Sequence, residues 1–183
     1  ETPLLNQLQN GFTIEAWVNM DAVGSVPQRQ YVVHKKDQGV SDEGSSFVFL
    51  SRAGSLVANP GNQGVLALGL HDGMADTVLR ENYVFSSLAI DTFGWHHVSV
   101  ALDRTTGDVR FTLDDQVDFQ PGAAVGPLFA GQDNDDTLFI GAHPTGVAPP
   151  NPPNEGFDGL LDEVRISNTF LSTSELLPVP EPA

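Results

Sequence analysis

The segment Gly159-Leu160-Leu161-Asp162-Glu163-Val164-Arg165-Ile166 is the stretch of this sequence that decides its fold. Leu160, Val164 and Ile166 share one parity, and the residues between them are mostly polar. Successive side chains of a β-strand point to opposite faces, so this alternation predicts a strand with one buried face. The remaining position on that apolar face is Asp162, which the alternation therefore directs towards the core.

Comparable segments recur along the chain. Phe12–Asn19 alternates in the same way, and Trp95–Asp103 and Val109–Asp114 are joined by a glycine-containing turn, which predicts a β-hairpin. Further strands are expected at residues 31–35, 46–51, 65–71, 77–83, 86–90, 116–119 and 138–142. Ser172–Leu177 begins with Ser/Thr caps and a following acid, which predicts a single helical turn. Short strands about 8–12 residues apart predict one all-β domain, built as a sandwich or barrel.

The composition fits one globular domain and excludes some classes of binding partner. The chain has 183 residues, of which 40% are hydrophobic and 17% charged, enough for a sizeable core. Eight basic and 24 acidic residues give a formal net charge of −16. This charge repels polyanions such as nucleic acids and anionic membrane surfaces, so we expect no nucleic-acid partner. We expect no membrane insertion, because no apolar run approaches the ~18 residues that span a membrane. The chain has no cysteine, which excludes disulfides, thiolate metal sites and cysteine nucleophiles.

Four blocks of sequence resemble, in order and spacing, the signatures of laminin G-like, concanavalin A-like jelly-roll domains. They are Phe12–Val18, Trp95–Val98, Leu138–Gly141 and Phe157–Ile166. The resemblance runs from about Leu4 to Leu177, and with the flanking residues it implies a domain over residues 1–177. The implied fold is a concanavalin A-like jelly-roll sandwich of two antiparallel sheets. That fold hosts lectins, carbohydrate-binding modules, adhesion modules and some glycoside hydrolases, so the function stays open.

Both ends of the chain differ from the full family patterns. Only Glu1–Gly11 precede the Phe12 block, where family members have an additional strand; that strand is shortened, missing or supplied by a partner. Residues 178–183 are a proline-rich tail, and Val179-Pro180-Glu181-Pro182-Ala183 resembles the start of the bacterial PEP-CTERM sorting signal. The apolar segment and basic cluster that follow this motif in that family are absent here. The resemblance implies export to the cell surface or extracellular matrix.

Asp162 is the most informative candidate site residue. A carboxylate on the apolar face of a strand is costly to bury, so it needs hydrogen-bond donors or a metal ion. One alternative is a structural calcium, since Ca²⁺ binds carboxylate and carbonyl oxygens and related jelly rolls often hold one near this position. The others are a carboxylate that accepts backbone N–H groups and a catalytic acid. The acidic run with Asp133, Asp135 and Asp136 either supplies calcium ligands or is a solvated turn.

Recognition of sugars needs aromatic rings that stack on pyranose faces, with polar groups nearby for the hydroxyls. The aromatic candidates are Trp17, Tyr31, Tyr83, Phe85, Trp95 and Phe157, most of which also suit core or edge packing. We expect Trp17 and Tyr83 to contribute to ligand binding, Trp17 because it lies on the polar side of its strand. The segment Pro144–Gly156 is either the rim of such a site or a rigid surface loop; the rim would use His143, Asn151 and Asn154.

Catalytic signatures are missing from the sequence. Retaining glycosidases of this fold carry two glutamates flanking an aspartate at alternating strand positions, and Leu161–Arg165 does not contain that triple. His96 and His97 are neighbours on a strand and face opposite sides, so they do not suggest a zinc pair. We predict an exported, non-catalytic module that binds polysaccharides or matrix and cell-surface components, with a structural calcium. The alternatives are a subunit of an extracellular filament or sheath, hence a homo-oligomer, and a polysaccharide-cleaving enzyme.

Overall fold

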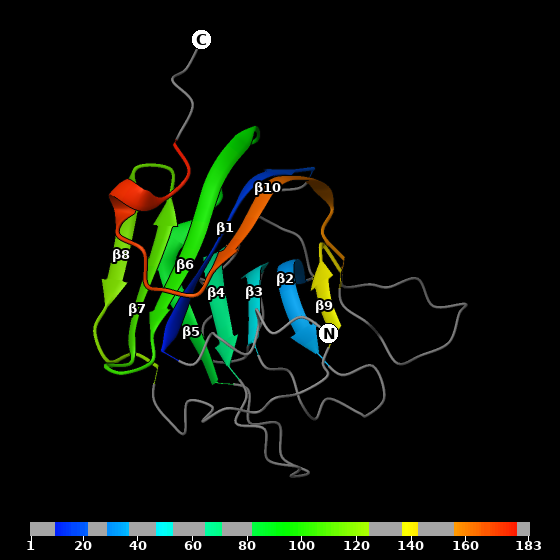
Figure 1. The fold of residues 1–183 in the computed structure, drawn as a ribbon. Helices are drawn as coiled ribbons and strands as arrows, with labels where there is room; N and C mark the ends of the chain where they lie inside the picture. The colour runs from blue at the N-terminus through cyan, green and yellow to red at the C-terminus, as the bar shows by residue number, and fades with distance from the viewer. Residues whose placement is uncertain are drawn as a thin grey trace.

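The computed structural model describes residues 10–21, 29–36, 47–52, 65–70, 82–124, 137–142 and 156–178. Within these ranges lie ten β-strands and one turn of 3₁₀-helix (Figure 1). Their bounds are β1 (Gly11–Met20), β2 (Arg29–Lys36), β3 (Phe47–Arg52), β4 (Val65–Leu70), β5 (Asn82–Ala89), β6 (Trp95–Asp103), β7 (Asp108–Leu113), β8 (Gln116–Gln120), β9 (Thr137–Ile140), β10 (Gly159–Ser167) and η2 (Thr173–Glu175). The described residues include no helix long and apolar enough to cross a membrane.

The strands form two five-stranded antiparallel sheets. Sheet A has the order β10-β1-β6-β7-β8, and sheet B has the order β5-β4-β3-β2-β9. Strands β10, β1 and β6 lie side by side in the front layer of Figure 1, with sheet B behind them. The predicted all-β sandwich of two antiparallel sheets is confirmed, and the expected hairpin is present as β6 and β7.

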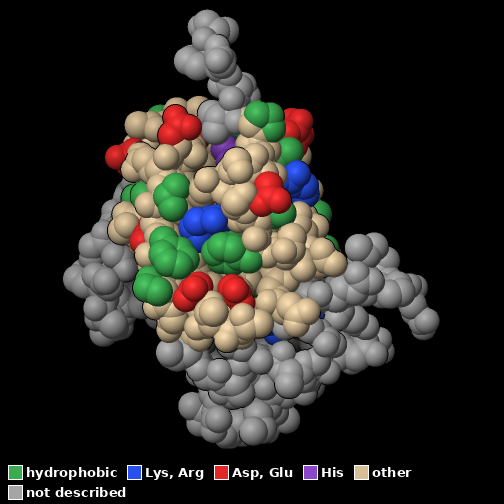
Figure 2. Space-filling model, turned by 60° about the vertical axis from the view of Figure 1, so that its left-hand side comes forward, with side chains coloured by type: hydrophobic (Ala, Val, Ile, Leu, Met, Phe, Trp, Pro, Cys, Tyr) green, Lys and Arg blue, Asp and Glu red, His purple; other side chains and the backbone are tan. Residues whose placement is uncertain are grey.

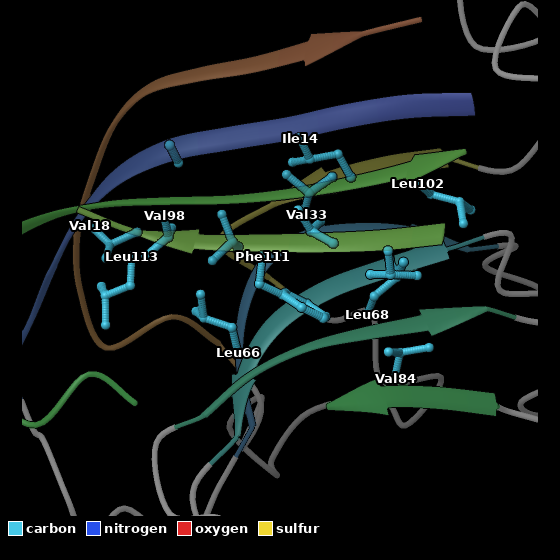
Figure 3. Close-up of a cluster of buried hydrophobic side chains, with 14 of the residues drawn as sticks. Ile14, Val18, Val33, Leu66, Leu68, Val84, Val98, Leu102, Phe111 and Leu113 are labelled. Carbon is cyan, nitrogen blue, oxygen red and sulfur yellow. The ribbon is translucent and has the colours of Figure 1, made fainter. Parts of the chain in front are cut away.

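The hydrophobic core lies between the two sheets and comes from one parity of each strand (Figure 3). In β1, the core residues are those expected from the alternation: Phe12, Ile14, Ala16 and Val18. Sheet A adds Val98, Val100, Leu102, Phe111 and Leu113, and sheet B adds Val33, Leu66, Leu68 and Val84. Full burial of each large aliphatic side chain stabilises the fold by about 1.5–3 kcal/mol. Residues of the opposite parity therefore lie on the outer faces of the sheets, where several of them, such as Glu15 and Tyr31, are buried by further contacts.

Two predicted strands are a single strand in the structure. The sequence predicts a break between residues 83 and 86, but β5 is continuous from Asn82 to Ala89. The break is absent because Val84 and Leu88 both reach the core and Ser86 is buried between them. Residues 77–81 of the earlier predicted strand lie outside the described residues.

The predicted helical turn near the C-terminus is confirmed as η2. The Glu175 carboxylate accepts hydrogen bonds from the backbone N–H of Ser172 at 2.8 Å and from its hydroxyl at 2.6 Å. These contacts satisfy a donor that a helix start leaves free, which is the physical reason for the Ser-x-x-Glu pattern.

The predicted orientation of Asp162 is wrong because β10 contains a β-bulge. Trp17 of β1 pairs with Asp162, whereas Glu15 pairs with Arg165, so two residues of β10 lie opposite the single residue between them. Glu163, within the bulge, has a φ of 47°. An extra residue reverses the parity of a strand. Val164 therefore faces the core, while Asp162 lies exposed on the outer face of sheet A.

Gly159 allows β10 to begin in close contact with β1. Its φ is 142°, and a Cβ at this position would lie 2.1 Å from the carbonyl oxygen of Asn19. A side chain there would push the two strands apart, so only glycine fits the start of the segment. The register that brings Gly159 opposite Met20 therefore depends on this residue.

Candidate functional site

A cluster of rings lies on the outer face of sheet B. Leu66 and Leu68 of β4 face the core, so Ala67 between them points outwards, as do the residues on either side of Val84 in β5. The cluster comprises Tyr31, His34, Ala67, Tyr83 and Phe85, and we call it the sheet B ring cluster. It is separate from the main core.

The rings of this cluster form two stacked pairs. The Tyr83 and Phe85 centroids are 5.8 Å apart with an interplanar angle of 28°, and those of Tyr31 and His34 are 5.2 Å apart at 16°. Phe85 pairs with Ala67 across the sheet. Tyr31 and Ala67 are buried, whereas Tyr83 and Phe85 are half-buried. The cluster therefore has a fixed floor and a more accessible ring pair on the edge strand β5.

Of the predicted ligand-binding residues, the structure places Trp17 and Tyr83 on opposite sides of the molecule. Tyr83 belongs to the sheet B ring cluster, whereas Trp17 lies on the outer face of sheet A, where it pairs with Asp162. The two do not form one site. The other predicted ligand-binding residues, His143, Asn151 and Asn154, lie outside the described residues.

The other ring-bearing members of the cluster, Tyr31, His34 and Phe85, are not among the ligand-binding residues that the sequence predicts. Tyr31 and Phe85 are aromatic candidates, but both faces of the surrounding strands are rich in apolar residues, so the alternation does not separate outer from inner positions. In β2 the register also shifts between Tyr31 and Val33, which breaks the parity. The aromatic character of Tyr83 and Phe85, two residues apart, is the signal that identifies this face.

The predicted calcium ligands find limited support in the structure. Asp162 is exposed, and its Oδ1 accepts the backbone N–H of Glu163 at 2.8 Å, the alternative to a metal that the sequence left open. A structural calcium takes six to eight oxygen ligands, of which Asp162 alone would supply one or two. Among the residues that the structure describes, no three His, Cys, Asp or Glu side chains are grouped to hold a metal ion. Asp133, Asp135 and Asp136 lie outside those residues.

The buried carboxylate of sheet A is Glu15. It lies on the polar parity of β1 yet is fully buried. Its Oε2 lies 3.0 Å from Nε2 of His97 and accepts the backbone N–H of Leu177 at 2.7 Å, while Oε1 forms an ion pair with Arg165. Burial raises the pKa of Glu15, but the hydrogen bonds from His97, Leu177 and Arg165 outweigh it and hold that pKa below its usual range.

Glu15 is buried because the chain after β10 crosses the outer face of sheet A. We call residues 168–178 the C-terminal strap. The hydroxyl of Thr13 donates to the carbonyl of Thr169 at 2.7 Å and accepts the N–H of Leu171 at 2.9 Å. Arg110 donates to the Leu171 carbonyl, and its guanidinium lies 4.7 Å from the ring centroid of Phe170. These contacts make the Glu15 network a structural anchor for the strap.

The surface around the strap mixes residue types. Figure 2, turned to bring the left-hand side of Figure 1 forward, shows hydrophobic, basic and acidic side chains interspersed over this face. Val117 and Phe119 of β8 are exposed and pair with Thr112 and Arg110 of β7. Beneath the strap, Glu15 is fully buried and both of its carboxylate oxygens have partners.

The adjacent histidines have separate partners, as their alternation predicts. His96 places Nδ1 at 2.8 Å from Oδ2 of Asp114 and Nε2 at 3.1 Å from Oγ1 of Thr92. His97 faces Glu15 and packs against Trp17, with ring centroids 5.3 Å apart. Both histidines therefore fix local structure.

Comparisons with known proteins agree with this architecture. The family model described as the concanavalin A-like lectin/glucanases superfamily matches residues 1–177. Comparison with curated protein sequences found no match. Similar solved structures include the CBM40 of the Ruminococcus gnavus IT-sialidase bound to α2,6-sialyllactose, with 11% identity and a TM-score of 0.63 over 93% of this chain and 82% of that one.

Two further solved structures are similar. A putative carbohydrate-binding protein from Bacteroides ovatus has 18% identity and a TM-score of 0.59, and covers 91% of this chain but 40% of that one. An SAP-like pentraxin from Limulus polyphemus has 17% identity and a TM-score of 0.55, over 90% of this chain and 66% of that one. At these identities the likeness shows the fold alone. By its family match and its two-sheet sandwich, the chain belongs to the concanavalin A-like lectin/glucanases superfamily.

Proposed function

We propose that this domain is a non-catalytic module that binds glycans through the sheet B ring cluster. The observation that carries this proposal is the stacked pair of Tyr83 and Phe85, half-exposed on β5 above the buried Tyr31 and Ala67. Aromatic rings combine a large apolar face with few rotatable bonds, so they lose little entropy when they contact a ligand. The apolar face of a pyranose ring stacks on such a pair of aromatic rings.

The comparisons support this proposal without identifying the ligand. One similar structure holds sialyllactose, and another is described as a putative carbohydrate-binding protein. The net charge of −16 favours neutral glycans over sulfated or phosphorylated ones, because the field of the whole protein repels polyanions. Within the superfamily, this proposal places the chain with the lectins rather than the glucanases.

The test is binding to a panel of laminarin, xyloglucan, amylose, sialyllactose and alginate, measured by affinity electrophoresis for the polysaccharides and calorimetry for the oligosaccharide. The double variant Tyr83→Ala, Phe85→Ala is expected to weaken binding about tenfold. Phe119→Ala, an exposed ring on the other sheet, is the matched control and should bind like the wild type. Equal affinity of the double variant and the wild type, or failure of every glycan to bind, contradicts the proposal.

Release of reducing ends from any of these polysaccharides would instead support the enzyme alternative. The contacts of Glu15 argue against that outcome, because both of its carboxylate oxygens already have partners beneath the strap. A catalytic carboxylate must reach its substrate at hydrogen-bond distance.

The extracellular location is a second part of the proposal. It is supported by the Val179–Ala183 sequence, which resembles an export signal, and by the similarity to the LG1–3 region of the laminin α2 chain. Fractionation of cells that express the full gene, with antibody detection of this domain, tests it. Detection in the cytoplasm alone would overturn the location and leave the glycan proposal intact.

Calcium remains a proposal for the acidic run only. Asp133, Asp135 and Asp136 supply three carboxylates in four residues, the kind of oxygen donors that Ca²⁺ prefers. A rise in Tm on addition of calcium that EDTA reverses, and that Asp135→Asn abolishes, is the expected result. The variant Asp162→Asn should leave this rise unchanged. A Tm that neither calcium nor EDTA alters removes the metal.

Self-assembly into a filament or sheath is the second candidate function. Val117 and Phe119 favour it, because two exposed apolar side chains on an edge strand form a contact surface for another copy. Light scattering at high protein concentration tests it: assembly that Val117→Ser with Phe119→Ser abolishes supports this candidate, and a strict monomer excludes it.

A further inference from the structure

Both tryptophans of the chain lie on the outer face of sheet A. Trp17 in β1 and Trp95 in β6 share the parity opposite to the core residues Val18 and Val98. Trp95 pairs with Asn19, and Asn19 also pairs with Leu160 of β10. The neighbouring cross-strand row joins Asp162 to Trp17 and Trp17 to His97. We call Trp17, Asn19, Trp95, Leu160 and Asp162 the tryptophan face.

Two apolar members of this face, Trp95 and Leu160, are exposed. Trp95 is 45% exposed and Leu160 is 58% exposed, and each lies one strand away from the half-buried Asn19. Trp17 is 8% exposed and forms the floor beside them. The strands that carry these residues, β10, β1 and β6, are adjacent in Figure 1. The surface is therefore a shallow apolar platform with an amide at its centre.

Local contacts hold the backbone around Trp95 in place. The carboxylate of Asp114, in the β7–β8 turn, accepts the backbone N–H of His97 at 2.9 Å and lies 2.8 Å from Nδ1 of His96. His96 also contacts Thr92, so the turn before Trp95 is tied to the same carboxylate. A side chain on a fixed backbone loses less conformational entropy when a ligand stacks on it than one on a mobile segment.

The bulge in β10 adds a carboxylate to this platform. Without the extra residue, the alternation would direct Asp162 towards the core. With it, Asp162 is exposed next to Trp17, and the φ of 47° at Glu163 is the local strain that this orientation requires. Bulges that re-aim a side chain are often found at functional sites. Asp162 is bonded to the Glu163 N–H through Oδ1, and its exposed carboxylate has acceptor capacity beyond this bond.

The chemistry of this face suits a neutral sugar. An exposed indole and an aliphatic side chain match the apolar face of a pyranose, and an amide and a carboxylate bind its hydroxyl groups. Asp162 and Glu163 are both exposed here and disfavour an anionic ligand. We propose that the tryptophan face is a second saccharide site, and that a single copy of the domain bridges two glycan chains.

This inference rests on the proposed glycan binding by the sheet B ring cluster and extends it. The two surfaces are outer faces of opposite sheets, with the hydrophobic core between them. One bound sugar segment therefore does not contact both. Two sites that point away from each other give bridging between chains, which a monomer with one site does not produce.

Tryptophan fluorescence separates the two sites because the chain contains only two tryptophans and both lie on this face. The probes are laminarin and xyloglucan, both neutral. In the double variant Tyr83→Ala, Phe85→Ala, addition of the polysaccharide is still expected to shift the emission. In Trp95→Ala this shift should be lost, while binding measured by affinity electrophoresis persists at the sheet B cluster. Asp162→Asn should weaken the fluorescence response about tenfold.

Bridging is measured as turbidity when the protein and polysaccharide are mixed near equivalence. The wild type should produce turbidity, and Trp95→Ala should abolish it although the variant still binds. Light scattering without glycan identifies self-association; turbidity that depends on a dimer overturns bridging by a single copy. Fluorescence that no polysaccharide alters, with glycan binding intact, overturns the second site and leaves the first. Failure to bind either polysaccharide by any readout removes both.

Discussion

Glu15 is the residue on which the polar contacts of sheet A converge. It joins the first strand to His97 of β6, Arg165 of β10 and Leu177 of the strap. A charged group without water is tolerated only when partners replace its solvation. The stability of the outer layer of sheet A should therefore depend on this one carboxylate.

Replacement of Glu15 by Gln is expected to destabilise the fold by about 1–2 kcal/mol, because the hydrogen bonds to the buried side chain lose their charged acceptor, while water still solvates the partly exposed Arg165. The measurement is urea unfolding followed by circular dichroism. Glu163→Gln, an exposed carboxylate on the same sheet, is the control and should change the free energy of unfolding by less than about 0.5 kcal/mol. A loss at Glu15 as small as that of the control would show that the network contributes nothing.

The pH dependence of stability should carry the signature of Glu15. Its pKa is lower in the folded state than the ordinary value of 4.5, so its contribution is complete above that value and is lost as the pH falls through the folded pKa. Thermal unfolding of the wild type between pH 6 and pH 3 should show a decline that begins near pH 4.5. The Glu15→Gln variant should show a shallower decline over the same range, and identical slopes would contradict this assignment.

Glu15 and Asp162 show how far an alternating sequence pattern predicts which carboxylates are buried. The alternation directs Asp162 towards the core and puts Glu15 on the polar side of β1, yet Asp162 is exposed and Glu15 is buried. It misses Glu15 because burial there comes from the strap, a segment without regular alternation, more than 150 positions away in the sequence. It misplaces Asp162 because a one-residue bulge leaves no periodic signal.

Side-chain hydrogen bonds join the edge strands of the two sheets. Strand β8 ends sheet A and β5 ends sheet B, and the carboxylate of Asp118 in β8 accepts the backbone N–H of Ser87 in β5 at 2.6 Å and the hydroxyl of Ser86 at 3.1 Å. Gln120 donates to the Phe85 carbonyl at 2.8 Å. Side chains thus satisfy backbone groups of edge strands that would otherwise be open to another chain.

Substitution of Asp118 by Ala is expected to open this side of the sandwich. Burial raises the pKa of Asp118, but hydrogen bonds from Ser87, Gln120 and Ser86 hold it below its usual range, so the charged form is the bound one. We expect a loss of about 1–2 kcal/mol and faster hydrogen exchange at the Ser87 amide. Asp115→Ala, in the exposed β7–β8 turn, is the matched control. Unchanged exchange at Ser87 in the Asp118 variant would contradict this role.

The sequence predicts most of the strands and the one helical turn. Alternation identifies β1, β6, β7 and β10 because each packs an apolar face into the core and carries mostly polar residues on the other, and the capping pattern identifies η2. It divides β5 incorrectly because two adjacent serines resemble a turn, although Ser86 fits beneath Asp118. Pairing between strands is set by contacts across the sandwich, which no local pattern records.

For the whole molecule, the excess of acidic residues is the dominant electrostatic feature. A formal net charge of −16 on a chain of 183 residues produces repulsion between like charges that the compact state must accommodate. The described ion pairs that involve Glu15 and Asp114 offset only a small part of it. The overall class, an all-β sandwich with an acidic surface, follows from composition and strand spacing, whereas the placement of two ring platforms on opposite faces needs the structure.

Salt should therefore stabilise this domain. An increase in NaCl from about 10 to about 150 mM shortens the Debye length from about 30 to about 8 Å and is expected to raise Tm by about 2–4 °C. Differential scanning calorimetry measures the change, and KCl should give the same curve as NaCl. A fall of Tm with salt would mean that attractive pairs such as Glu15 and Arg165 outweigh the repulsion.

The strap also sets a constraint on when the protein folds. The hydroxyl of Thr13 binds Leu171 and the carboxylate of Glu15 binds Leu177, separations of 158 and 162 residues. During synthesis, β1 waits for β10 and the strap before its second edge and its outer face are covered, so the ribosome releases nearly the whole domain before sheet A is complete. Long-range pairing of this kind makes folding slow. The nascent chain must avoid aggregation during that interval. Repulsion between the negative charges of neighbouring chains works against aggregation.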